Sequence, residues 1–181
     1  MRIPNVSDKR VRRTRRLLRD ALLALVAERG WDAVSVLDVC ERADIGRSTF
    51  YTHFAHKEAL LLSGFDELRE FLRADAKTVR GRSSSLPFLR GLIEHVHENR
   101  RMFRSLMGKH AGQLAQKNFR LFVFTMVREA LGARNEAAAR YVAGGIAELL
   151  IWSVDLRPAP ETAQLEKLCL QFSEPLLARV R

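Results

Sequence analysis

The sequence has few of the features that mark secreted, membrane-spanning or metal-binding chains. It contains two cysteines, Cys40 and Cys169, which lie far apart without metal-site spacing, so we expect two buried free thiols in a reducing cytoplasm. No apolar run reaches the length of a membrane span. The apolar stretch at 21–27 follows basic residues, but Glu28 and Arg29 occupy the place of a cleavage site. We therefore expect no secretory signal and a cytoplasmic location.

Catalytic patterns are also absent. An enzyme would need a nucleophile with its base, a set of metal ligands or a phosphate-binding loop, and we find none of these in the sequence. His95 and His97 are two residues apart on a predicted helix, so their side chains point in different directions and do not form a metal pair. We expect neither enzymatic activity nor a cofactor or metal.

Strand patterns are nearly absent, whereas apolar residues recur at spacings of three and four, as in Leu18, Leu22 and Leu25. This predicts an all-α chain of about nine helices. We place them at about 7–28, 36–43, from 47, 56–79, 86–98, 100–108, 110–132, 135–155 and 161–179. The polar segment at 80–85 is the clearest linker. Pro175 predicts a kink or a break in the last helix.

What the sequence has in excess is positive charge. The formal net charge is +10, and residues 1–19 carry eight Arg or Lys and one Asp. A field concentrated at one end favours a polyanionic partner, although a solvated helix face is the alternative for any basic run.

The segment 35–54 predicts two short helices joined by a tight turn. Ser35 and Asp38 have the spacing of a capping box, and Gly46 is the residue expected to supply a positive φ or a close backbone approach in the turn. Phe50 and Phe54 are four residues apart and are expected to face inward. The side chains that then face outward are Arg47, Ser48, Thr49, Tyr51, Thr52 and His53. Such a pair of helices fits a helix-turn-helix.

Residues 34–60, VSVLDVCERADIGRSTFYTHFAHKEAL, resemble the DNA-binding signature of the tetracycline-repressor (TetR) family of bacterial transcriptional regulators. The resemblance is specific over about 8–62 and architectural beyond. It implies phosphate contacts from Thr49, Tyr51 and Lys57. It also places four side chains at base edges, namely Arg47, Ser48, Thr52 and His53. The chain departs from the family at Asp44, where a turn glycine is usual, and at His56, where a Ser or Asn cap is usual.

The basic N-terminus completes this expectation. Arg10, Arg12 and Arg13 can follow phosphates or enter the minor groove as an arm, with solvated side chains as the alternative. We therefore predict a three-helix DNA-binding domain at 1–56 and a helical domain for effector binding and dimerisation at 57–181.

The segment 118–131 is apolar nearly all round, so its helix is expected to be central in the second domain, and plain core packing is one reading of its side chains. The resemblance implies a small-molecule effector bound between helices of this domain. The residues we assign to this site are Leu92, His95, Phe103, Met107, Phe122, Thr125, Met126 and Trp152.

Small residues on the next helix suggest a close helix neighbour, and intramolecular packing is the alternative to a partner subunit. They are Ala138, Ala139, Ala143, Gly144 and Gly145. With Leu165, Leu168, Cys169, Phe172 and Leu176 of the last helix they predict a homodimer through the last two helices. The resulting function is a repressor released from its double-stranded operator by an apolar ligand. The alternative is a regulator of the same fold without a small effector, controlled by a protein partner or constitutive.

Overall fold

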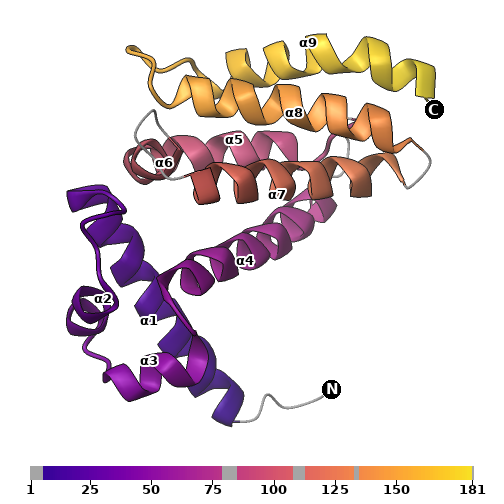
Figure 1. The fold of residues 1–181 in the computed structure, drawn as a ribbon. Helices are drawn as coiled ribbons and strands as arrows, with labels where there is room; N and C mark the ends of the chain where they lie inside the picture. Colours follow the sequence, from indigo (N-terminus) through magenta and orange to yellow (C-terminus); the bar gives the residue numbers. More distant parts are fainter. Residues whose placement is uncertain (1–5, 79–84, 108–112, 133–134, 181) are drawn as a thin grey trace. The chain divides into compact units, whose positions relative to one another are not determined.

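The computed structural model describes residues 6–78, 85–107, 113–132 and 135–180. Nine helices and no strand occur in this part of the chain, which confirms the all-α prediction. The helices are α1 (Val6–Arg29), α2 (Val36–Ala43), α3 (Arg47–His53), α4 (Lys57–Thr78), α5 (Leu89–Glu98), α6 (Arg100–Met107), α7 (Gln113–Leu131), α8 (Glu136–Ser153) and α9 (Thr162–Val180) (Figure 1). The predicted linker at 80–85 lies outside the described residues except for Ser85.

The chain packs as two units, Met1–Asp66 and Glu67–Arg181, with the division inside α4. The functional boundary predicted between residues 56 and 57 stays a prediction. Within the described ranges, no helix is both long enough and apolar enough to cross a membrane.

The core of the first unit is built from the apolar side of α1 and the aromatic side of α3. Leu18, Leu22 and Leu25 are at most 2% exposed. Phe50 and Phe54 are 0% and 5% exposed, and their ring centroids are 5.9 Å apart. A helix of seven residues is too short to be stable by itself, so this burial holds α3 in place.

Helix α2 begins with the predicted capping box. The Asp38 backbone N–H donates to Ser35 Oγ at 3.1 Å, and the Ser35 backbone N–H donates to the Asp38 carboxylate at 2.8 Å. The Ser35 hydroxyl also donates to this carboxylate. Hydrogen bonds from Ser35, with a smaller effect from the nearby Arg29 guanidinium, lower the pKa of Asp38.

The turn between α2 and α3 differs from the prediction. Asp44, not Gly46, adopts the left-handed conformation, with φ 52°, whereas Gly46 has φ −61° and caps α3. The Asp44 and Ile45 backbone N–H groups donate to Glu41 O at 3.2 Å and Cys40 O at 3.0 Å, which is the Schellman pattern. Aspartate tolerates the left-handed region better than most residues, so the turn forms without glycine there.

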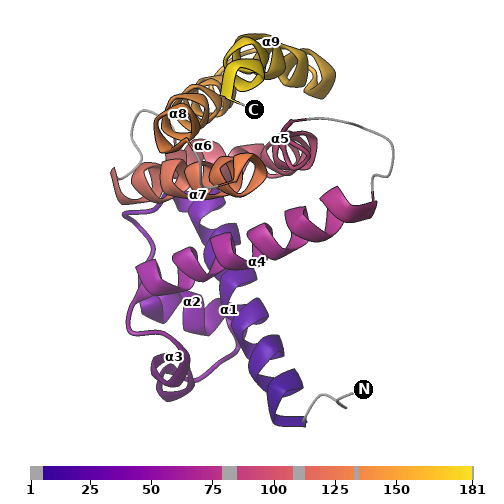
Figure 2. The same cartoon turned by 90° about the vertical axis from the view of Figure 1, so that its right-hand side faces the viewer.

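In the second unit α8 packs against α7 and α9, and α9 also packs on α5 (Figures 1 and 2). Ala139, Ala143 and Ala147 recur every four residues on α8 and are at most 2% exposed. Their small side chains allow the neighbouring helices to approach closely. Helix α9 continues through Pro175, so the predicted break does not occur. Leu177, 0% exposed, packs beyond the proline and helps to hold the helix end.

Candidate nucleic-acid interface and interior of the second unit

Helix α3 presents a polar face to the surface. Because Phe50 and Phe54 are buried, the remaining side chains of the helix face outward, as the spacing predicts. The exposed ones are Arg47, Ser48, Thr49, Tyr51 and Thr52, and His53 is half-buried. Tyr51 is 51% exposed. Its ring makes an edge-on contact with the buried Phe50 ring, at 5.4 Å between centroids, and this contact orients the Tyr51 side chain.

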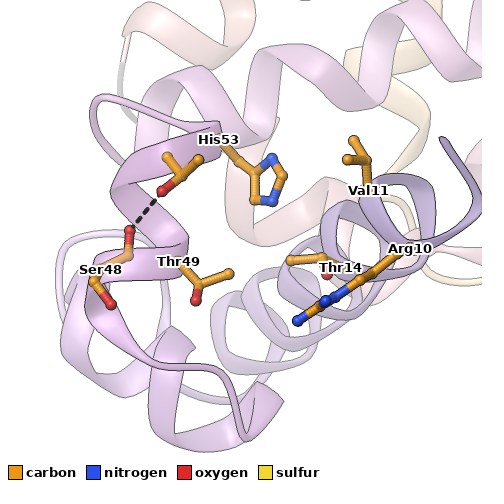
Figure 3. A pocket seen from close by; sticks show the side chains of 7 residues that line it. Arg10, Val11, Thr14, Ser48, Thr49 and His53 are labelled. Carbon is orange, nitrogen blue, oxygen red and sulfur yellow. Dashed lines mark hydrogen bonds between the residues drawn. The ribbon is translucent and has the colours of Figure 1, made fainter. Parts of the chain in front are cut away.

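A groove of about 570 Å³ lies between α1 and α3. Figure 3 shows Thr49 and His53 of α3 facing Arg10, Val11 and Thr14 of α1 across it. Ser48 and Thr52 complete the lining. The groove therefore combines a guanidinium, hydroxyls and an imidazole, which are groups that hydrogen-bond to phosphate oxygens and base edges.

Two local arrangements shape the groove. The Thr52 hydroxyl donates to Ser48 O at 3.0 Å, so its lone pairs remain to accept a hydrogen bond from a ligand (Figure 3). Arg13 is exposed on α1, but Thr14 and Val11 lie beside Arg10 in the groove lining. The sequence-based site omits these two residues, although the i, i+4 spacing from Arg10 would have identified Thr14.

Lys57 does not point away from the protein. Its Nζ donates to Trp31 O at 2.9 Å and Val34 O at 2.7 Å, and it lies 4.5 Å from the centroid of the Trp31 ring. The preceding residue caps α4, since the Ala59 backbone N–H donates to His56 Nδ1 at 3.1 Å. The imidazole thus replaces the Ser or Asn cap that is usual in the resembled family.

Most of the predicted effector residues are brought together inside the second unit. Those at most 4% exposed are Leu92, Phe103, Met107, Phe122 and Met126. Ring contacts run from His95 to Phe103 (5.9 Å), from Phe103 to Phe119 (5.8 Å) and from Phe119 to Phe122 (6.5 Å). Burial lowers the pKa of His95 and favours its neutral form. Phe119 is absent from the sequence-based set, although it lies one turn before Phe122.

The other two predicted effector residues are not fully buried. The Thr125 hydroxyl donates to Leu121 O at 2.9 Å on its own helix. Trp152 is 52% exposed, so it is separate from the buried set. Periodicity alone did not distinguish the buried side of α8 from its outer side.

Trp152 belongs to an exposed stripe on α8, which we define as Tyr141, Gly145 and Trp152. Tyr141 is 74% exposed, and a Cβ added at Gly144 or Gly145 would meet no neighbouring atom within 4 Å. By contrast, the alanines at 138, 139 and 143 are buried within the second unit, as are Leu165 and Cys169. The prediction that these five face a partner subunit is therefore wrong. Phe172 of α9 remains 61% exposed.

Neither the histidines nor the cysteines form a metal site in the described part of the chain, where no three His, Cys, Asp or Glu side chains group suitably. His97 Nδ1 lies 3.0 Å from Thr162 Oγ1. Burial, with the Arg100 guanidinium, lowers the pKa of His97. Cys40 and Cys169 are buried free thiols as predicted, and burial raises the pKa of Cys169 to about 11.

Comparison with known proteins gives matches at the N-terminal end of the chain. Residues 18–63 match the family described as "Bacterial regulatory proteins, tetR family". The HTH-type transcriptional repressor KstR of Mycolicibacterium smegmatis is 43% identical over 74 residues, which are 41% of this chain and 35% of the relative. KstR of Mycobacterium tuberculosis is 39% identical over 85 residues, 46% and 37% of the two chains. These alignments span little more than a third of either relative.

Solved structures match over nearly the whole length. A TetR transcriptional regulator from Streptococcus agalactiae has a TM-score of 0.65 at 21% identity, covering 93% of this chain and 97% of that chain. FadR of Thermus thermophilus, solved in complex with lauroyl-CoA, has a TM-score of 0.61 at 19% identity, covering 88% and 93%. At these identities the likeness shows the fold.

Proposed function

Because residues 18–63 match the tetR family of bacterial regulatory proteins and the N-terminal part is similar to KstR repressors, we propose that the chain is a tetR-type, sequence-specific DNA-binding transcriptional repressor. The observation that carries this proposal is the polar face of α3 beside the groove lined by Arg10. In a helix-turn-helix the second helix enters the major groove, with its N-terminal residues nearest the bases. Arg47 and Ser48 stand at that end of α3.

The side chains divide by their chemistry into two roles. Thr49, Tyr51 and Arg10 hold phosphates and set the protein's position on the duplex. Arg47 is suited to bidentate pairing with the O6 and N7 atoms of a guanine. The other base-edge candidates are Ser48, Thr52 and His53.

We expect two exposed arginines to have different effects on DNA binding. Arg47→Ala should cost about 1–3 kcal/mol at one base-pair position and relax specificity there, whereas Arg10→Ala should weaken binding on all sequences and reduce the salt slope by about 0.9. The measurement is affinity against salt, for a duplex selected from a random library and for its single-base variants. Arg101→Ala, at an exposed position of α6, is the control for loss of one charge. Equal behaviour of all three variants contradicts the assignment.

We propose further that the protein acts as a homodimer through α8 and α9. Large apolar side chains are exposed on the stripe of Tyr141, Gly145 and Trp152, and Phe172 is exposed on α9. No contact within the subunit explains the glycine at position 145, because an added Cβ would meet no atom within 4 Å. Two such helices from each of two subunits would form a four-helix bundle about a two-fold axis. A near-palindromic operator follows from that symmetry.

The release signal we propose is an apolar small molecule bound among Phe103, Met107, Phe122 and Met126. Support comes from the grouping of these side chains inside the second unit, and from the lauroyl-CoA complex of a protein with the same fold. Methionines and aromatic side chains suit an adaptable apolar pocket.

Helix α6 provides a physical route from this interior to the α8 stripe. Arg104 donates from Nε and Nη2 to Val154 O at 3.0 and 2.8 Å, and Arg100 donates from Nε to the same oxygen at 3.2 Å. The helix that carries Phe103 and Met107 is thus tied to the C-terminal end of α8. A ligand that shifts α6 would move the surface on which the two subunits meet.

The effector proposal is tested by operator affinity with and without saturated acyl-CoAs of increasing length, including lauroyl-CoA. A coupling of about 1–3 kcal/mol would lower operator affinity about 5- to 150-fold. Phe122→Ala should reduce this response, and Phe71→Ala, at an exposed position of α4 outside the proposed ligand site and dimer surface, is the control. A ligand that binds equally well with and without DNA shifts nothing and defeats the switch. If no acyl-CoA binds, the result favours the regulator without a small effector, consistent with the close ring contacts of Phe103, Phe119 and Phe122.

A further inference from the structure

The side chain of Lys57 joins two parts of the first unit that are distant in sequence. It is the first residue of α4, and the carbonyls it binds belong to Trp31 and Val34 in the connection between α1 and α2. Two of its three ammonium protons donate to those oxygens, and the charge also lies over the Trp31 ring. The side chain is half-buried rather than extended into solvent.

The connection it holds determines where α2 starts. Gly30 leaves α1 with φ 81°, and the Val34 backbone N–H closes a turn on Trp31 O at 3.3 Å. Val34 is 2% exposed, and Ser35, the next residue, is the cap of α2. Trp31 O accepts hydrogen bonds from both Val34 and Lys57. A lost Lys57 contact therefore loosens the turn that leads directly into the helix-turn-helix.

The position of α3 depends on this chain of contacts. α2 leads into α3 through the Schellman turn at Asp44, so a displaced start of α2 displaces the polar face of α3 relative to α1. The groove between α1 and α3 requires both helices in register, because Arg10 and Thr49 line opposite sides of it.

We propose that Lys57 serves DNA binding as a positioning residue, clamping α4 to the α1–α2 connection through Trp31 and Val34, instead of serving as a phosphate ligand. This proposal rests on the proposed DNA-binding function and replaces the phosphate contact that the family resemblance implies for Lys57. A lysine that donates two of its three ammonium protons to backbone carbonyls, and whose charge faces an aromatic ring, is built into the fold. A phosphate ligand would instead present its ammonium group to solvent.

The two roles give opposite results in a salt titration. A phosphate ligand contributes about 0.9 to the slope of log affinity against log salt concentration, and a clamp contributes nothing of that size. We therefore measure affinity for the selected duplex at several salt concentrations with the full chain and three variants. Lys57→Met removes the donors and the charge, Trp31→Leu removes the ring but keeps the charge, and Lys117→Met removes an exposed charge from α7.

We expect Lys57→Met to lower affinity about 5- to 30-fold with an unchanged slope, and Trp31→Leu to lower it although Lys57 is present. The double variant should lose less than the product of the two single losses, because both remove the same clamp. Lys117→Met should bind the duplex with the same affinity and the same salt slope as the parent. The clamp proposal is overturned if Lys57→Met reduces the salt slope by about 0.9 while Trp31→Leu binds the duplex with the affinity of the parent.

Thermal unfolding tests the Lys57 clamp without relying on DNA binding. If the parent selects no duplex, the DNA-binding proposal fails, and the clamp is judged by Tm alone. Lys57→Met and Trp31→Leu should each lower the Tm of the first unit by about 4–8 °C, with little further loss in the double variant. Additive shifts, or no shift in either single variant, overturn the clamp independently of DNA.

Discussion

Phe50→Ala is expected to lower the free energy of unfolding of the first unit by about 3–5 kcal/mol and to abolish operator binding. Phe50 is 0% exposed, and its ring contacts both Phe54 and Tyr51. Because α3 has only seven residues, the cavity removes the contact that holds the helix against the core. Native-state hydrogen exchange of the amides of α2 and α3 measures the loss, and titration of the selected duplex measures its consequence for binding.

The matched control for this variant is Phe71→Ala. Phe71 is 58% exposed on α4 in the second unit, so the same chemical change should alter stability by no more than about 0.5 kcal/mol. Equal protection of α3 amides in the parent and in Phe50→Ala would show that the aromatic side does not anchor this helix.

The second large effect is expected from Gly145→Leu, which should convert the proposed dimer to monomers at micromolar concentration. A Cβ at this position meets nothing in the subunit, and leucine has a helix propensity about 0.8–1 kcal/mol better than glycine. The subunit itself should therefore be as stable as the parent or more so. Only a surface that packs closely against Gly145 from outside the subunit would be disrupted.

Loss of the dimer should lower operator affinity by about 10²- to 10⁴-fold, because the second half-site is no longer bound intramolecularly. Sedimentation velocity measures the assembly, and titration of the selected duplex measures the affinity. Ala130→Leu, an equivalent enlargement at an exposed position of α7, is the control and should remain dimeric. A Gly145→Leu protein that sediments as a dimer with parental affinity argues against the α8 stripe as the interface.

The proposed switch begins with contacts inside the second unit that join the proposed ligand site to the α8 stripe. The buried phenylalanines lie partly on α6, and the guanidinium groups of Arg100 and Arg104 bind the carbonyl of Val154 at the end of α8. In this proposal, a bound effector would first shift the α8 surface on which the two subunits meet. Its influence on α3 would then depend on how the two subunits of the proposed dimer are held relative to each other.

The sequence was sufficient wherever the deciding interactions are local. The helix pattern, the Ser35 capping box and the inward direction of the pair Phe50 and Phe54 all follow from spacings of about four residues. The polar face of α3 follows directly from that pair. Family resemblance then supplied the functional roles of its side chains, which spacing alone does not contain.

Only the tertiary structure decided which groups meet across the chain. It showed Lys57 bound to carbonyls 26 and 23 residues away, and it divided the small residues of α8 into buried alanines and open glycines. It also showed that Trp152 lies at the surface, and that Asp44, not Gly46, is the turn residue in the left-handed conformation. The reason is physical. Helical periodicity specifies which side chains share a face, whereas the packing of other helices determines whether that face is covered, and by what.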